Sequence, residues 1–115
     1  MITALHSLVL PGHEADYEKT HARIPADLVA SFERVGIRDW TIWRVDRHLF
    51  HLVDCDDLPA ALDLLTEDPA NQAWQERIGV HVEVFDPADS SGNPAPLHQV
   101  WQLAAQSVDA SEEQR

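Results

Sequence analysis

The sequence predicts an α+β domain of the ferredoxin-like class, a split βαβ arrangement in which helices cover one face of an antiparallel sheet. Three observations predict it. The 115 residues suffice for one layered core but not for two. Runs rich in β-branched and aliphatic residues alternate with helical runs in the order strand, helix, strand, strand, helix, strand. Proline and glycine punctuate the joins between them.

The first strand is expected at residues 2–10, "ITALHSLVL", which ends at a Pro-Gly turn signal. Apolar side chains fall on both of its faces, which indicates a central position in the sheet. A helical stretch follows at 13–36, with acidic residues in its first turn, where the helix dipole favours anions. Pro25 splits this stretch into two helices, and Gly36 ends the second one.

A hairpin is expected next, from strand-like runs at 39–45 and 49–54 that residues 46–48 separate. Because side chains alternate along a strand, Trp40 and Trp43 must point to opposite faces of the sheet.

In the second half of the chain, two helices, a loop and a last strand are expected. Residues 57–80 predict a helix, a break at Asp68-Pro69 and a second short helix. Residues 86–96 form a loop rich in proline, glycine, serine and aspartate. The last strand is expected at 97–104, "LHQVWQLA". The domain therefore spans 1–104, and 105–115 is a polar C-terminal tail.

A two-layer domain leaves one face of its sheet bare. Either a second copy of the chain packs there, giving a homodimer, or a ligand pocket forms between the sheet and its loops. The two solutions are compatible, and the architecture predicts a dimer with a cavity near the sheet.

Charge narrows the possible partners. The formal net charge is -12, and no Lys/Arg cluster interrupts it, so nucleic acid and anionic membranes are not expected partners. The single cysteine, Cys55, sits among aspartates that disfavour its thiolate. The N-terminus lacks the basic flank of a signal peptide, and no apolar run has membrane-spanning length, so a cytoplasmic location is expected.

One spacing suggests chemistry. Tyr17 and His21 stand at i and i+4 and so share one side of a helix. A histidine exchanges protons near neutral pH, and a phenol holds a substrate oxygen. The alternative is a boundary tyrosine beside a surface histidine. His13 extends the row and raises the question of a metal, but a tyrosine between two histidines is a poor zinc set, and no metal is expected.

The four tryptophans exceed what so small a core needs. Trp43 and Trp101 are expected in core or interface packing. Trp40 and Trp74 are candidates for a pocket wall, because indole faces stack on sugar rings. The other histidines show no metal-ligand spacing and are expected on the surface or on strands: His6, His48, His51, His81 and His98. Phosphate loops and nucleophile elbows are missing, so no cofactor is expected and the chemistry should be proton transfer.

Five segments in this order carry a family resemblance: "YEKTHARIPADL", "GIRDWTIWR", "LFHLVDCDD", "DPANQAWQ" and "LHQVWQL". Together they resemble the L-rhamnose mutarotase family over nearly all of residues 1–104. The resemblance implies a dimeric α+β barrel that interconverts the α and β anomers of a 6-deoxy sugar.

The resemblance also implies roles for individual residues. His21 matches the proton donor, and Tyr17 matches the tyrosine that contacts the sugar. Trp40 matches an aromatic pocket position, and Trp74 the first of an aromatic pair. Gln75 stands where the rhamnose enzymes carry a second tryptophan, so a hydroxyl-binding amide replaces a stacking wall.

The expected function is therefore a sugar mutarotase, an isomerase acting on L-rhamnose or L-fucose by acid/base-catalysed ring opening and closing. Its partner would be a monosaccharide. Two alternatives stay open: a non-catalytic dimeric barrel that binds a small ligand, and, by fold analogy alone, a cofactor-free oxygenase or haem-degrading enzyme.

Overall fold

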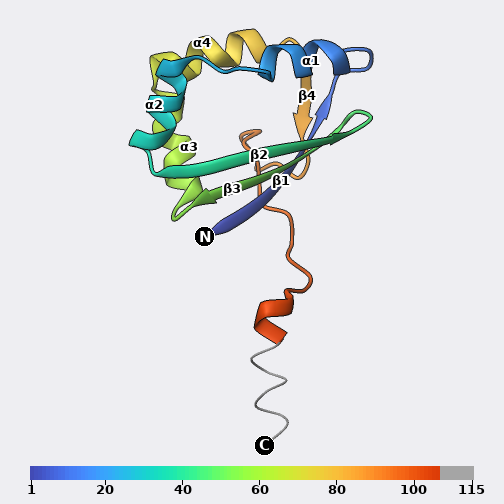
Figure 1. The fold of residues 1–115 in the computed structure, drawn as a ribbon, viewed down its shortest axis with the longest axis vertical. Helices are drawn as coiled ribbons and strands as arrows, with labels where there is room; N and C mark the ends of the chain where they lie inside the picture. The colour runs from blue at the N-terminus through green and yellow to red at the C-terminus, as the bar shows by residue number, and fades with distance from the viewer. Residues whose placement is uncertain (107–115) are drawn as a thin grey trace, which may run out of the picture.

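A computed structural model describes residues 1–106 and has the predicted α+β architecture. Its sheet is antiparallel, with the strand order β2-β3-β1-β4. The strands are β1 (Ile2–Val9), β2 (Ile37–Val45), β3 (His48–Cys55) and β4 (Val82–Phe85). Figure 1 shows the helices gathered on one side of this sheet. The first strand is central, as its two apolar faces predicted.

Four helices cover the sheet, and several of their ends lie next to a proline or a glycine. They are α1 (Glu14–His21), α2 (Ala26–Arg34), α3 (Leu58–Thr66) and α4 (Pro69–Ile78). Pro25 divides α1 from α2 in extended backbone, as predicted. The Asp68 side chain accepts a hydrogen bond from the Ala70 amide at the start of α4. Gly36 ends α2 with φ 91°, a conformation that favours glycine.

The β2–β3 hairpin has a shorter turn than expected. His48 pairs with Val45 as the first residue of β3, so Asp46 and Arg47 alone form the turn. Asp46 takes a φ of 52°, which aspartate tolerates better than most residues. The Val9 amide donates to the Arg47 carbonyl at 2.8 Å, and Arg47 Nε donates to the Val9 carbonyl at 2.9 Å. The hairpin tip is thereby fastened to the end of β1.

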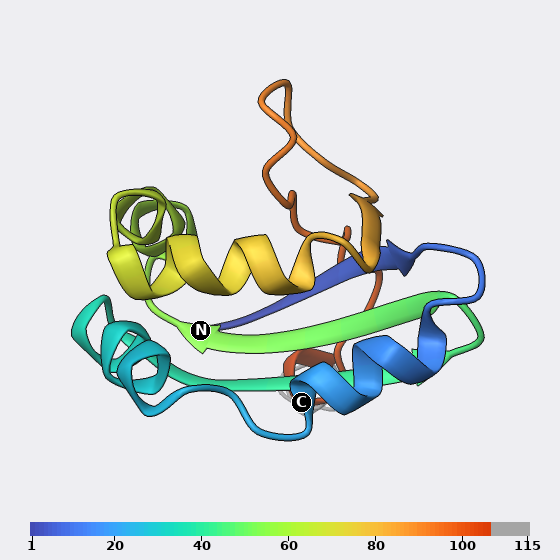
Figure 2. The same cartoon turned by 90° about the horizontal axis from the view of Figure 1, so that it is seen from above.

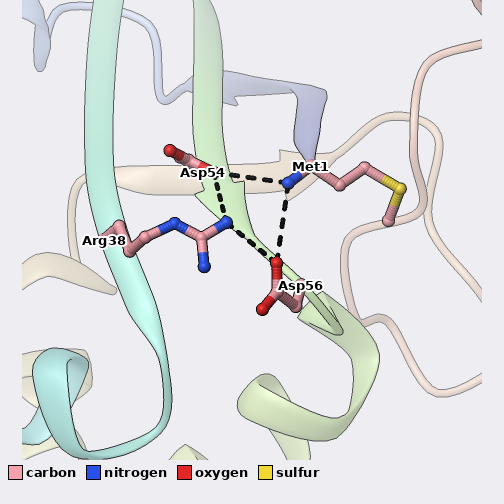
Figure 3. A network of polar contacts seen from close by, with 4 residues as sticks. All are labelled: Met1, Arg38, Asp54 and Asp56. Carbon is pink, nitrogen blue, oxygen red and sulfur yellow. Dashed lines mark hydrogen bonds and ion pairs between the residues drawn. The ribbon is translucent and has the colours of Figure 1, made fainter.

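At the end away from the hairpin turn, ion pairs join β2, β3 and the N-terminus. Arg38 donates to Asp54 at 2.7 Å and to Asp56 at 3.0 Å, and the amino group of Met1 lies 3.4 Å from Asp54 (Figure 3). The hydrogen bond from Arg38 holds the pKa of Asp54 below its ordinary value. This exposed network ties the N-terminus to β2 and β3.

Between sheet and helices the core divides into two clusters. One packs β1 and β3 against α3 around Leu5, Val53 and Leu65. The other packs α1 and α4 against the sheet and contains Tyr17 and Trp74. Figure 2, which looks down on the helices, shows α1 and α4 over the same face of the sheet, with the central strands visible between them.

The last strand was predicted in the wrong place. Residues 97–104 form no strand: after Leu97 donates to the Ala4 carbonyl at 2.8 Å, the chain leaves the sheet and begins a helical turn at 103. The fourth strand is the short segment "VEVF", which pairs with the end of β1 from Ser7 to Val9. Trp101 is 62% exposed and so is not a core residue of the single chain. The expected tail, 105–115, lies outside the described residues apart from its first two positions.

The sheet face away from the helices carries exposed apolar side chains. Trp43 and Phe50 are cross-strand partners there and are 52% and 41% exposed. Leu52 and Val84 add to the same face at 40% and 44%. In the described part of the chain, no helix has the length and apolar character needed to cross a bilayer.

Candidate active site

A cavity of about 1130 Å³ is lined by residues of both the helices and the sheet. All five residues singled out from the sequence contribute to its wall: Tyr17, His21, Trp40, Trp74 and Gln75. They come from α1, β2 and α4, which are distant in sequence. The fold thus brings the predicted site residues to one chamber.

Tyr17 and His21 project together from α1. Their rings stack with centroids 4.4 Å apart and an interplanar angle of 27°, as the i, i+4 spacing predicted. The edge of Trp74 meets the His21 ring at 5.0 Å and 83°. Tyr17 and Trp74 are 4% and 5% exposed, so both are packed walls rather than surface side chains.

His21 has an unsatisfied nitrogen. Its Nδ1 is buried and meets no hydrogen-bond partner in the described residues. Burial lowers the pKa of His21 to about 4, so the imidazole is neutral at pH 7 and carries one N–H and one lone pair. An unpaired buried polar atom is costly. His21 lines the cavity, although its Nδ1 atom has almost no accessible surface.

The Tyr17 phenol has the complementary property. Burial raises its pKa far above the ordinary value, which keeps the hydroxyl protonated through the physiological range. A protonated phenol is a hydrogen-bond donor at neutral pH. The α1 pair therefore offers a neutral imidazole and a permanent hydroxyl donor to whatever occupies the cavity.

Trp40 and Gln75 lie at the edge of this arrangement. Trp40 is half-buried and stacks on Phe32 with centroids 5.7 Å apart. Its indole N–H already donates to His51 Nδ1 at 3.1 Å, so the ring face is its remaining binding surface. Gln75 is exposed on α4, and its amide donates a long 3.4 Å hydrogen bond to Asn71.

Sequence reasoning missed His51, which was expected among surface or strand histidines. It is 4% exposed and lies on the cavity floor, where its Nε2 is 2.9 Å from Ser7 Oγ. A signal was available: His51 has the same strand parity as Leu49 and Val53, which are fully buried.

The partners of His51 fix its tautomer. An indole N–H can only donate, so Nδ1 must accept from Trp40. The proton of the neutral ring is then on Nε2 and is donated to Ser7. Burial, together with the smaller effects of the nearby His21 and His6, lowers the pKa of His51 to about 4. His51 therefore has both nitrogens engaged and no free lone pair, in contrast to His21.

The comparisons with known proteins identify a family and a shared fold. The model of the family described as L-rhamnose mutarotase matches residues 2–103. Among solved structures, an L-rhamnose mutarotase from Formosa agariphila superposes with a TM-score of 0.68 at 15% identity, covering 90% of this chain and 98% of that one.

Two further structures share the fold. The tetracenomycin F2 cyclase of Streptomyces glaucescens has a TM-score of 0.61 and 18% identity, over 89% of this chain and 97% of that one. A putative antibiotic biosynthesis monooxygenase from Bordetella bronchiseptica has a TM-score of 0.59 and 20% identity, over 89% and 96%. At such identities the likeness concerns the fold alone. No curated protein matches the sequence.

Proposed function

The chain belongs to the L-rhamnose mutarotase family, and from this premise we propose that it interconverts the α and β anomers of a 6-deoxy-L-hexose, L-rhamnose or L-fucose, by opening and closing the sugar ring. The observation that carries the proposal is that His21, neutral at pH 7, lines one cavity together with Tyr17, Trp40 and Trp74.

The chemistry needs little more than this histidine. Ring opening puts a proton on the ring oxygen and removes one from the anomeric hydroxyl, and ring closing reverses both transfers. The C1–ring oxygen bond breaks to give an aldehyde and a hydroxyl, and no oxidant or reductant takes part. A neutral imidazole holds an N–H and a lone pair, so His21 can serve in either direction, and such help contributes about 10²–10⁴-fold. Tyr17 orients a sugar oxygen with its hydroxyl.

Sugar selection falls to the remaining cavity residues. Trp74 and Trp40 present aromatic surface to the C–H faces and the methyl group of a deoxy sugar. Gln75 lines the same cavity with an amide that can hydrogen-bond a hydroxyl. This amide is why L-fucose, which differs from L-rhamnose in hydroxyl configuration, is included in the proposal.

The test measures anomer exchange by NMR saturation transfer on L-rhamnose and L-fucose. Wild-type protein should raise the anomer-exchange rate of at least one sugar above the rate in buffer. In His21→Gln the catalysed part of that rate should be about 10²–10⁴-fold lower. His98→Gln is the matched control, since His98 is exposed and outside the cavity. If wild-type protein accelerates neither sugar, or if His21→Gln retains full activity, the proposal fails.

The proposal includes a homodimer built on the bare face of the sheet. A row of exposed apolar side chains on that face, among them Trp43 and Phe50, would be buried by a second copy. Light scattering coupled to size exclusion should give twice the chain mass for wild-type protein, and Phe50→Glu should shift it toward the monomer. A wild-type monomer at micromolar concentration would contradict this part of the proposal.

Binding without turnover is the second candidate, and one observation favours it. The cavity, about 1130 Å³, lies above the ~300–1,000 Å³ range of ordinary small-molecule pockets. A ligand bulkier than a monosaccharide would therefore fit. Saturable quenching of tryptophan fluorescence without any gain in anomer exchange would support this candidate over the first.

A further inference from the structure

A second cluster of histidines lies outside the cavity. His13 precedes α1, and His81 lies in the turn before β4. Their Nδ1 atoms are 3.0 Å apart, and the Asp16 carboxylate and both nitrogens lie within 4.8 Å of one another. None of the three residues lines the cavity. The sequence could not reveal this pair, because its histidines are 68 positions apart.

The backbone holds the two histidines in register. The Leu10 amide donates to the His81 carbonyl at 2.9 Å, and the His13 amide donates to the Leu10 carbonyl at 3.0 Å. The His81 amide in turn donates to the Ile78 carbonyl at the end of α4 at 3.0 Å. Both imidazoles are half-buried. The backbone therefore brings the two side chains together, and a hydrogen bond between their Nδ1 atoms joins the rings.

The donor set fits a divalent transition metal. In a tetrahedral zinc site with Zn–N bonds of ~2.0–2.1 Å, two ligand nitrogens are roughly 3.3 Å apart. The histidine pair needs only a small outward adjustment, and the Asp16 oxygen, which lies within 4.8 Å of both nitrogens, must move closer to them. Two imidazole nitrogens and one carboxylate oxygen form a donor set that suits zinc and neighbouring transition metals, whereas calcium and magnesium prefer oxygen ligands alone. A water would complete the coordination.

Local charge does not oppose such an ion. The N-terminal end of α1 carries a partial positive charge, which disfavours a cation. Glu14 and Asp16 in its first turn offset this effect, and the chain as a whole has a formal charge of -12. The exposed Asp16 keeps the cluster open to ions from solution.

We propose that His13, Asp16 and His81 bind a divalent transition-metal ion of the zinc class, which clamps the start of α1 to the turn before β4. The clamp acts on the helix that carries Tyr17 and His21, so the ion would hold the candidate active-site residues in place without touching the cavity. This site is independent of the proposed function, because its binding can be measured without any sugar.

The experiment uses tag-free protein stripped with a chelator and dialysed. Calorimetric titration should show one equivalent of Zn²⁺ bound, and Co²⁺ should give the visible absorption of a low-symmetry nitrogen and oxygen site. Zn²⁺ should also raise the melting temperature. In His81→Gln the affinity should fall by at least about a hundredfold, the upper end of what losing an outer-shell partner costs.

His98→Gln is the matched control, since it removes an exposed histidine outside the cluster and should bind Zn²⁺ like wild-type protein. If His81→Gln does not fold, Asp16→Asn replaces it, because Asp16 is exposed and its change should weaken binding while the circular dichroism spectrum stays native. Absence of Zn²⁺ binding to wild-type protein overturns the proposal. Equal binding by wild-type protein and the cluster variants does so too.

Discussion

This protein should begin to lose stability at a pH well above the one at which its carboxylates become protonated. His51 should account for a measurable share of this loss of unfolding free energy. Its pKa is about 4 in the folded state against 6.5 for a free histidine. Between those values the unfolded state binds a proton that the folded state does not, so stability falls as the pH falls through this window. Moving from pH 7 to 5 favours the unfolded state roughly twentyfold, which is about 2 kcal/mol.

The assay is urea denaturation at pH 7 and pH 5, comparing wild-type protein with His51→Gln. Glutamine can accept from Trp40 and donate to Ser7, as His51 does, but it does not titrate. The variant should therefore lose about 2 kcal/mol less than wild-type protein over this interval. Carboxylates such as Asp54 have lowered pKa values, so their losses fall at lower pH. Equal losses in the two proteins would refute the claim that His51 is buried in its neutral form.

Three further changes test other parts of the structure. Trp40→Phe removes the indole donor to His51 Nδ1, so NMR titration should show the pKa of His51 rising toward its ordinary value, and an unmoved pKa would contradict the assigned tautomer. Asp68→Ala removes the cap at the Ala70 amide, and urea denaturation should show a loss of about 1–2 kcal/mol; no loss would mean that the cap is dispensable. Gly36→Ala places a side chain at φ 91° with nothing within 4 Å of its Cβ, so a loss of about 1–2 kcal/mol in the same assay would be backbone strain alone, and a neutral result would argue against that conformation.

The arrangement of most elements was predictable because local signals agreed with it. Pro25 and Asp68-Pro69 divide each helical half of the chain in two, and in each case the structure has a helix boundary there. The central position of β1 followed from apolar residues on both of its faces. These signals act over a few residues, so a single sequence contains them.

The fourth strand was assigned to the wrong segment although a local signal was present. Residues 80–85, "VHVEVF", alternate valine with polar side chains and end in phenylalanine, which is a strand pattern, and "VEVF" pairs with β1. Residues 97–104 also carry apolar and aromatic side chains, and local pattern does not decide which of two such segments pairs with the free edge of β1. Val100, at 90% exposed, shows that an apolar strand-like run can lie outside the sheet of the single chain.

Long-range contacts also give the two cavity histidines different hydrogen-bond partners, which the sequence alone does not indicate. His51 is buried and His21 is half-buried, and both have a pKa near 4, so by titration alone they look equivalent. Their partners make them different: Trp40 and Ser7 occupy both nitrogens of His51, whereas the buried Nδ1 of His21 has no partner among the described residues. A ligand oxygen that reaches His21 breaks no hydrogen bond made by Nδ1 to these residues, but at His51 it must displace Trp40 or Ser7. We therefore propose His21 as the residue that exchanges protons with a sugar, whereas His51 holds the Trp40 ring that forms part of the wall.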